Sequence, residues 1–393
     1  MGITQHTCGE ENVHAIINLA LSKGFVGREG CGLMPIRGHS GVQGGAEMGA
    51  YATAFPGGKA VNVENAAELS GLYGFDVPST PGMTTPQMMD AAGEGNMDVL
   101  FAVGGNFREA MPNPKGVDEA LANIPLRVHM DIVLSSQMLV EPKETVLLLP
   151  AMTRYEIPGG VTETSTERRI IFSPEVPGPR IGEARPEGEI LTELAAKVRP
   201  ELAEKIRFTN TQAIRDEIAR VVPFYKGIET LQKKGDSVQY GGEMLCKGWN
   251  FPTLDGKARF YASALPADVL AENEFMVITR RGKQFNSIVH QDLDPMNKQL
   301  RDAVLMNEED AKRLGFRAGE RVVLGNAFGS FTGRVVIAPL ASRTIQVHYP
   351  ESNVLVDPKA RSHLAQIPAF KEVIATIRPA KSEDVVKTPL INV

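Results

Sequence analysis

Arg37 and His39 stand two residues apart, and both side chains could act on a small anionic substrate. A guanidinium presents a planar fork that matches the two oxygens of a carboxylate, so Arg37 could fix the orientation of such a group. An imidazole titrates near neutral pH, and His39 could therefore carry a proton. Other roles are open: Arg37 could bind loop carbonyls or a cofactor phosphate, and His39 could simply hydrogen bond within its loop.

The stretch around these two residues, from Gly27 to Gly45, is rich in glycine. Such a composition fits neither a helix nor a strand and predicts a loop whose backbone approaches a neighbour closely. Before it, apolar residues recur at helical spacing between Asn12 and Lys23, and Gly24 follows as a stop signal. We therefore predict an amphipathic helix that leads into the loop.

Gly104, Gly105 and Asn106 follow the apolar run 99–103, which is typical of a buried parallel strand. Because glycine has no side chain, these backbone amides could approach a phosphate or a nucleoside. Asp131 lies at the end of the next apolar run, where it could serve as a turn or helix-cap residue. The spacing is not G-x-G-x-x-G, which argues against a plain dinucleotide-binding protein.

The pattern of expected helices and strands divides the chain into two regions. The pattern of the first region predicts a doubly wound α/β fold, in which ligands bind at the carboxyl ends of the strands. Its strands are expected at 99–103, 126–132 and 145–149, with helices from 118, at 188–198 and at 211–222, and a proline-rich linker at 174–186. From residue 274 short β runs dominate and predict a small barrel-like domain. These runs are 275–279, 321–324, 333–338 and 344–348, interrupted by a helix at 308–314.

Length and composition exclude several classes of protein. A chain of 393 residues is too long for one compact core, and a net charge of -5 offers no basic stripe for nucleic acid. No apolar run is long enough to cross a membrane, and residues 1–11 do not resemble a secretion signal, so a cytoplasmic protein is expected. Three cysteines without a CxxC pair cannot supply the usual four ligands of an iron-sulfur cluster.

Several short motifs occur in the order seen in formate dehydrogenase alpha subunits. They lie at residues 1–6, 35–44, 103–106, 148–169, 251–260 and 279–286, and together they extend over nearly the whole chain. Each motif alone is weak, but such an ordered series is hard to obtain by accident. The chain thus resembles the carboxyl-terminal half of a molybdopterin-dependent oxidoreductase of this type.

The resemblance implies a fold and a cofactor. Residues 1–265 would form a partial molybdopterin oxidoreductase α/β region, and residues 266–393 a β-barrel-like molybdopterin dinucleotide-binding domain. The cofactor would be bis-molybdopterin guanine dinucleotide carrying molybdenum or tungsten. Formate or a similar small oxyanion would be the substrate.

The resemblance also assigns residues. Arg37 would face the substrate beside the metal, with His39 close by. Many formate dehydrogenases have Gln-Asn where this chain has His39-Ser40, whereas a subgroup with less certain substrates has His-Ser, so formate itself is in question. The expected cofactor neighbours are His6, Gly104, Gly105, Asn106, Asp131, Thr279, Arg280, Gln284, Asn286, Tyr349, Asn353 and Lys371. No residue of this chain is expected to ligate the metal.

Family members carry, ahead of the segment that matches residues 2–6, a cysteine-rich iron-sulfur domain and the metal ligand. We therefore expect a fragment or a split chain whose partner supplies that half and its 4Fe-4S cluster; a degraded relic is the alternative. A rival function is a non-catalytic half-enzyme that binds the cofactor or a partner subunit without turning over substrate.

Overall fold

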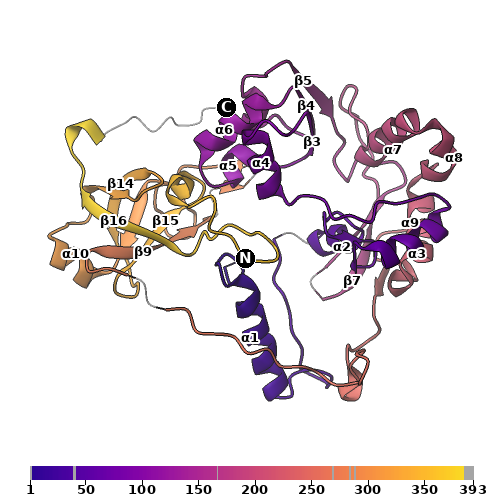
Figure 1. Cartoon of the computed structure of the whole chain (residues 1–393), viewed down its shortest axis with the longest axis horizontal. Coiled ribbons are helices and arrows are strands. Elements are labelled where there is room, and N and C mark those ends of the chain that lie inside the picture. Colours follow the sequence, from indigo (N-terminus) through magenta and orange to yellow (C-terminus); the bar gives the residue numbers. More distant parts are fainter. Residues whose placement is uncertain are drawn as a thin grey trace.

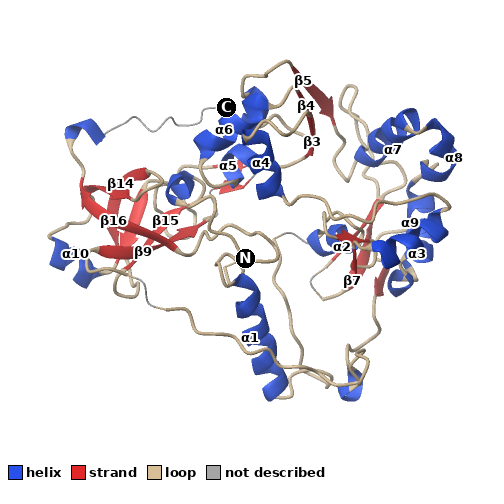
Figure 2. Cartoon of the chain, in the orientation of Figure 1, coloured by secondary structure: helices blue, strands red, loops and turns tan. Residues whose placement is uncertain are grey.

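A computed structural model describes residues 2–38, 41–165, 167–267, 270–282, 285–286 and 289–384, the side chains of 285, 286, 289 and 290 excepted. Three units with separate hydrophobic cores make up most of it, and Figures 1 and 2 show the helix α1 (Gly9–Ser22) extending below them. Within the described ranges, no helix combines the length and apolarity that crossing a membrane requires.

The first unit is a parallel sheet in the order β3-β4-β5, covered on one face by helices. Its strands are β3 (Val99–Val103), β4 (Leu126–Asp131) and β5 (Thr145–Pro150), with α4 (Thr85–Gly93), α5 (Phe107–Ala110), α6 (Pro114–Asn123) and η1 (Ser136–Leu139). Leu100 of β3 packs against Met89 of α4 and Leu121 of α6 in the core. On the sheet's opposite face, Val99, Val103 and Leu147 remain exposed.

The second unit is an antiparallel sheet in the order β6-β7-β8. Its strands are β6 (Val161–Thr164), β7 (Arg169–Ser173) and β8 (Ser237–Gln239), with α9 (Thr211–Val221), η3 (Pro223–Tyr225) and η4 (Ile228–Thr230). Ile170 and Phe172 of β7 form the core with Val222, Tyr225 and Tyr240. Other elements of the first 250 residues are α2 (Val42–Glu47), β1 (Ala54–Phe55), β2 (Lys59–Ala60), α3 (Val63–Tyr73), α7 (Glu187–Val198), η2 (Pro200–Leu202), α8 (Ala203–Ile206) and η5 (Lys247–Trp249).

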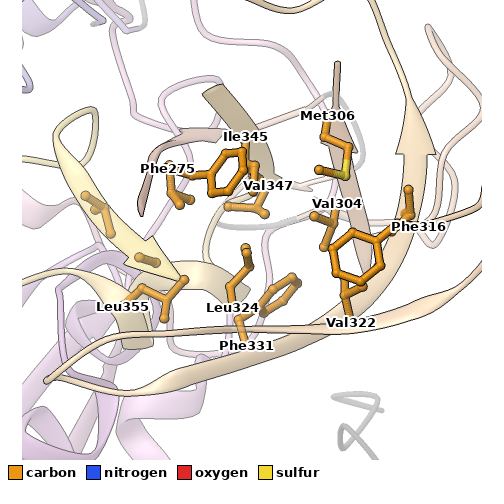
Figure 3. Close-up of a cluster of buried hydrophobic side chains, with 14 of the residues drawn as sticks. Phe275, Val304, Met306, Phe316, Val322, Leu324, Phe331, Ile345, Val347 and Leu355 are labelled. Atoms are coloured by element: carbon orange, nitrogen blue, oxygen red, sulfur yellow. The ribbon is translucent and has the colours of Figure 1, made fainter. Parts of the chain in front are cut away.

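The third unit is a closed six-stranded barrel in the order β12-β14-β13-β16-β9-β15. Its strands are β9 (Glu274–Arg280), β12 (Ala303–Met306), β13 (Arg321–Gly325), β14 (Ser330–Ile337), β15 (Thr344–His348) and β16 (Val373–Pro379). Strand β9 alternates inward and outward, so Phe275 and Val277 enter the apolar core that Figure 3 shows. Also present are β10 (Phe285–Asn286), β11 (Val289–His290), α10 (Glu308–Leu314), η6 (Glu351–Leu355) and η7 (Ser382–Asp384).

The predicted α/β region followed by a β barrel is confirmed. The predicted helix at 12–23 begins three residues earlier, at Gly9, and β12 and β16 were not expected from the sequence. The predicted domain boundary between 265 and 266 lies in an extended segment before β9 and stays a prediction.

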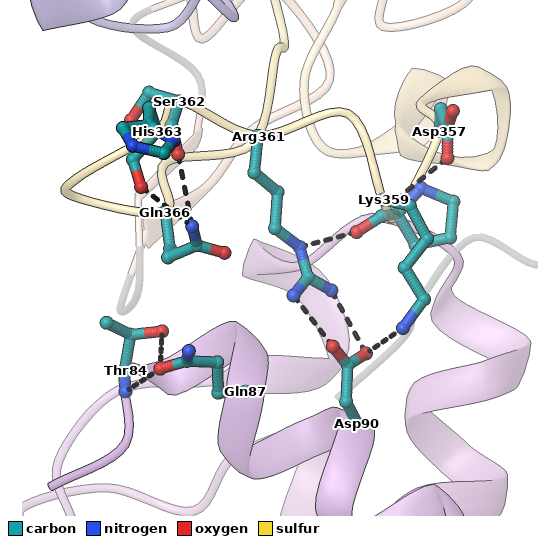
Figure 4. A network of polar contacts seen from close by, with 10 residues as sticks. Thr84, Gln87, Asp90, Asp357, Lys359, Arg361, Ser362, His363 and Gln366 are labelled. Atoms are coloured by element: carbon teal, nitrogen blue, oxygen red, sulfur yellow. Dashed lines mark hydrogen bonds and ion pairs between the residues drawn. The ribbon is translucent and has the colours of Figure 1, made fainter.

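An ion-pair cluster joins the first unit to the barrel (Figure 4). Arg361 donates two hydrogen bonds, of 2.8 and 3.0 Å, to the two carboxylate oxygens of Asp90 on α4, and Lys359 lies 3.0 Å from the same carboxylate. Burial alone would raise the pKa of Asp90, but these two cations outweigh it and hold that pKa below its ordinary value. The side chain of Arg361 is almost fully buried, so this contact fixes α4 against the barrel.

We expect Asp90→Asn to loosen this junction because the guanidinium of Arg361 would lose its charged partner in a buried place. The cost should be about 2 kcal/mol, as for hydrogen bonds between charged groups. Native-state hydrogen exchange should show α4 and residues 357–363 opening more readily. Glu119→Gln, which removes an exposed pair with Lys115, is the matched control and should change little. Equal exchange in both variants would contradict the assigned role.

Candidate functional site

The candidate site begins with a buried ion pair at the end of β9. Arg280 donates a 2.7 Å hydrogen bond to Asp294, whose side chain is fully buried. Burial alone would raise the pKa of Asp294, but the backbone amide of Met296 and the charge of Arg280 outweigh it and lower that pKa. Asp294 therefore stays ionised and holds the guanidinium at the end of the strand.

His348, at the end of the neighbouring strand β15, is fully buried beside this pair. Burial first, and then the positive charges of Arg280 and Arg301, lower the pKa of His348 to about 4. The ring is therefore neutral at pH 7. The backbone of Arg301 also lies within reach of the ring and slightly offsets this lowering of the pKa. A neutral imidazole offers one donor and one acceptor, so His348 can bind a polar group that enters here.

Thr279, Tyr349 and Lys371 lie around the same strand ends. The Thr279 hydroxyl donates to the carbonyl of Phe370, and the Lys371 ammonium donates to the carbonyl of Thr279. Burial, and then the charge of Arg280, lower the pKa of Lys371, whereas burial raises the pKa of Tyr349 to about 12. Thr279 is thus engaged in holding Lys371 and Phe370 in place, and the cations Lys371 and Arg280 both lie at this end of the barrel.

Asn353 connects the barrel to the α/β unit. Its side-chain amide donates to the backbone carbonyls of Glu109 (2.9 Å) and Met111 (3.3 Å). The backbone carbonyl of Asn353 accepts a hydrogen bond from the backbone amide of Asn113. Asn353 is fully buried, and its side-chain oxygen has no partner among the described residues. The barrel end therefore lies against α5, directly after the β3 turn.

On the α/β side, Gly104 and Gly105 form that turn in the left-handed region, at φ 66° and 79°. The Gly104 amide donates to the carbonyl of Met130, so it is engaged in the sheet. A Cβ added at either glycine would meet no atom within 4 Å, so the space beside them is open. The side chain of Asn106 donates to Ser136. Asp131 ends β4, and its carboxylate accepts from the amide of Ile132 within its own turn.

The amino-terminal segment is attached to the barrel beside Lys371. The backbone of Lys371 donates to the carbonyl of Gln5 (3.0 Å), and the amide and hydroxyl of Thr7 both donate to the carboxylate of Glu372. His6, which is half-buried, stands between these two contacts. The structure thus brings His6, Thr279, Arg280, Tyr349, Asn353 and Lys371 to one end of the barrel.

Arg37 lies elsewhere, in the loop before α2, and is half-buried. In the part of the chain that the structure describes, no hydrogen bond or ion pair engages its guanidinium. Burial and then the charge of Glu47 raise the pKa of Tyr240, and the positive charges of Arg37 and Arg168 offset part of that rise. Arg37 is therefore within electrostatic reach of the second unit.

A buried polar network fixes α2, and so the loop that carries Arg37, to the second unit. The side chain of Gln43 donates to Glu47 (2.8 Å) and to the hydroxyl of Tyr240, and the hydroxyl of Tyr225 donates to Glu47. Burial and the Glu47 carboxylate raise the pKa of Tyr225 far above its ordinary value, so this phenol remains a donor. The two tyrosine rings are 4.7 Å apart, and both are buried.

We expect Tyr225→Phe to free α2 because the Glu47 carboxylate loses a buried donor. Opening of residues 42–48 should become easier by about 1.5 to 3 kcal/mol, the range for a hydrogen bond to a charged group. Hydrogen exchange of that peptide measures the effect. Tyr155→Phe removes a phenol that binds Arg154 on the surface and should leave the peptide unchanged. If the 42–48 peptide exchanges as in the wild type, the network does not hold α2.

Comparisons with protein families match the α/β part and the barrel part of the chain separately. The molybdopterin oxidoreductase family model matches residues 1–197, and the molybdopterin dinucleotide binding domain matches residues 275–374, which include the barrel end described above. The chain belongs to the molybdopterin oxidoreductase family.

This member of the molybdopterin oxidoreductase family spans about half the length of two curated relatives that it matches. The protein YdeP of Escherichia coli is 28% identical over 97% of this chain and 52% of its own length. The F420-dependent formate dehydrogenase subunit alpha of Methanocaldococcus jannaschii is 29% identical over 94% of this chain and 56% of its own. Acetylene hydratase from Pelobacter acetylenicus shares the fold, with a TM-score of 0.52 at 16% identity over 76% of this chain and 47% of its own.

The residues at the barrel end fit a molybdopterin dinucleotide. The side-chain oxygen of Asn353 has no hydrogen-bond partner among the described residues, and the space beside Gly104 and Gly105 is open. Arg280 and Lys371 would suit the pyrophosphate, which carries negative charge. Over the described ranges, no group of three or more His, Cys, Asp or Glu side chains could hold a metal ion.

Three expected site residues are not placed. His39 and Gln284 lie outside the described residues, and only the backbone of Asn286 is described, in β10. Sequence reasoning missed Asp294, because it follows Arg280 by 14 residues and the two-residue strands β10 and β11 between them are too short to predict their pairing. It also missed the network of α2, although the spacing of Gln43 and Glu47, four residues apart, was an available signal.

Proposed function

We propose that this chain is the cofactor-binding and substrate-facing part of a molybdopterin oxidoreductase that oxidises formate or a similar small oxyanion. The observation that supports it best is the meeting of the β3 turn and the barrel end at Asn353, with the cations Arg280 and Lys371 on the barrel side. The formate dehydrogenase alpha subunits among the relatives support the substrate class.

The proposed cofactor is bis-molybdopterin guanine dinucleotide with molybdenum or tungsten. When bound, it would supply the two-electron redox step. His348, Asn353 and Lys371 would hold a pterin dinucleotide from the barrel side, with Arg280 fixed by Asp294 at the pyrophosphate. Gly105 would allow the backbone to approach from the α/β side, and Asp131 would contact the nucleoside.

Arg37 would bind the substrate. Formate loses two electrons and one proton to become carbon dioxide, so its two oxygens must be held while its C–H faces the redox centre. The guanidinium fork of Arg37 can hold both oxygens through parallel hydrogen bonds. His39 would receive the proton. The electrons would pass to a 4Fe-4S cluster in an amino-terminal half or partner polypeptide that also supplies the metal ligand.

Activity and cofactor content of the complete enzyme test this proposal. We expect formate-dependent dye reduction together with stoichiometric metal and pterin. The isolated chain should show neither iron-sulfur absorption nor formate oxidation. Stoichiometric cofactor without turnover of any small oxyanion would instead favour a non-catalytic half-enzyme. An iron-sulfur cluster reconstituted on the isolated chain would contradict the proposal that the cluster belongs to the amino-terminal half or partner polypeptide.

A further inference from the structure

The side chain of Gln137, in η1, binds the β3 turn on both sides of Asn106. Its nitrogen donates a 2.9 Å hydrogen bond to the carbonyl of Gly105, and its oxygen accepts a 2.7 Å hydrogen bond from the backbone amide of Phe107. The two partners fix the orientation of the side-chain amide, since each atom of that amide can make only one of the two bonds. Gln137 is 1% exposed, so water competes little for either partner.

Segment η1 is itself fixed to the α/β unit, so Gln137 is held from behind. Arg127 of β4 is fully buried and donates a 3.1 Å hydrogen bond to the backbone carbonyl of Gln137. Ser136 donates a 2.9 Å hydrogen bond to the carboxylate of Glu109 on α5. These contacts place the amide of Gln137 against the turn without any help from a ligand.

The β3 turn has few contacts of its own to hold it. Gly104 and Gly105 both have left-handed φ, and glycine loses more conformational entropy on folding than any other residue. Neither glycine has a side chain that could pack against a neighbour. The two hydrogen bonds from Gln137 offset part of this entropy loss. They keep the turn in one conformation before a ligand arrives, which lowers the ordering cost of binding.

Gln137 also orients the peptide group that joins Gly105 to Asn106. This peptide is trans, so its carbonyl and its N–H point in opposite directions. Because the carbonyl of Gly105 faces Gln137, the N–H of Asn106 is directed to the other side of the turn. The turn leads directly into α5, where the carbonyl of Glu109 accepts from Asn353 of the barrel. Gln137 therefore determines which backbone groups the turn presents next to the barrel end.

We propose that Gln137 is a positioning residue for the molybdopterin dinucleotide, because it holds the β3 turn in the conformation that receives this cofactor. The inference deepens the proposed function and rests on it in one respect, that the dinucleotide binds beside this turn. Gln137 lies buried behind the turn and acts through Gly105 and Phe107.

The rate at which the complete enzyme releases its pterin dinucleotide tests this inference. Gln137→Met keeps the approximate volume of the side chain and removes both hydrogen bonds, so we expect at least tenfold faster release than from the wild type. Val117→Ala removes buried apolar atoms from the core of the same unit and is the control for lost stability. It should release the cofactor within about twofold of the wild-type rate. In the cofactor-free proteins, hydrogen exchange of peptide 103–107 should be at least tenfold faster in Gln137→Met than in Val117→Ala.

Gln137→Glu gives a readout that a general loss of stability would not change. A protonated carboxyl has a donor and an acceptor and can restore both bonds, whereas a carboxylate cannot donate to Gly105. Burial and the charge of Glu109 favour the protonated form, and the charge of Arg127 favours the carboxylate. Release from Gln137→Glu, relative to the wild type at the same pH, should therefore slow towards the wild-type rate between pH 8 and pH 5. Gln137→Met should show no such recovery.

Three results would overturn the inference and leave the proposed function standing. They are release from Gln137→Met at the wild-type rate, equally fast release from Val117→Ala, and release from Gln137→Glu that is as fast at pH 5 as at pH 8. A wild-type enzyme that holds no pterin dinucleotide would instead overturn the proposed function, and this inference with it.

Discussion

Replacing Arg37 by Lys in the complete enzyme should lower turnover by about 100-fold or more, with metal and pterin content unchanged. Lysine keeps one positive charge, so a carboxylate is still attracted, but it loses the two-point fork that aims the substrate. Arg37→Ala should also weaken substrate binding because no cation remains. Metal content and turnover are measured on the same samples.

The control for this prediction is Arg28→Lys, nine residues earlier in the same glycine-rich stretch. Arg28 lies over the ring of Phe25, so its replacement changes a loop arginine away from the proposed substrate. We expect ordinary turnover per bound metal in that variant. The same ordinary turnover in Arg37→Lys would remove Arg37 from the catalytic residues, and loss of cofactor from Arg37→Lys would show that it holds the cofactor or its loop instead.

Arg280→Ala should destabilise the barrel by roughly 3 to 5 kcal/mol and abolish cofactor retention. The substitution leaves the fully buried carboxylate of Asp294 without its cation, which is the costly way to break a buried pair. The matched control is Arg334→Ala. It breaks a second Arg–Asp pair of the barrel, with Asp302, in which the side chains are 45% and 28% exposed, so a loss of at most about 1 kcal/mol is expected.

The pH dependence follows from the lowered pKa of Asp294. A carboxyl whose pKa is lower in the folded than in the unfolded state stabilises the fold above its unfolded pKa, near 4. That contribution is lost as the pH falls through the lower folded value. Hydrogen exchange of the barrel between pH 3 and pH 6 should therefore show this loss in the wild type and not in Arg280→Ala. An identical pH dependence in both proteins would mean that the pair contributes nothing.

The sequence predicted elements whose cause is local. The run Val99–Val103 was recognisable because five apolar residues end at two glycines, and the structure has the strand at the same bounds. Strand Ala303–Met306 escaped prediction because four apolar residues are too short a run to separate a strand from a loop or a helix turn. Its neighbours in the barrel are far away in the sequence, so only tertiary packing defines it.

The candidate site also combines residues that could be expected from the sequence with contacts that could not. Lys371 and Thr279 were expected as cofactor neighbours from the family resemblance, and the structure brings them into contact. No residue spacing could indicate that Asn353 would bind the carbonyl of Glu109, 244 residues away, or that Tyr225 would fix Glu47. Such contacts depend on how the units pack together, which a single sequence does not encode in any local pattern.

We propose that a molybdopterin dinucleotide binds between the β3 turn and the barrel end. Hydrogen exchange of the complete enzyme, with the cofactor and after production in a cofactor-deficient host, tests it most directly. We predict protection on cofactor binding in three peptides together: 103–107, 278–282 and 347–353. Protection confined to the barrel peptides, or to segments remote from all three, would contradict the account.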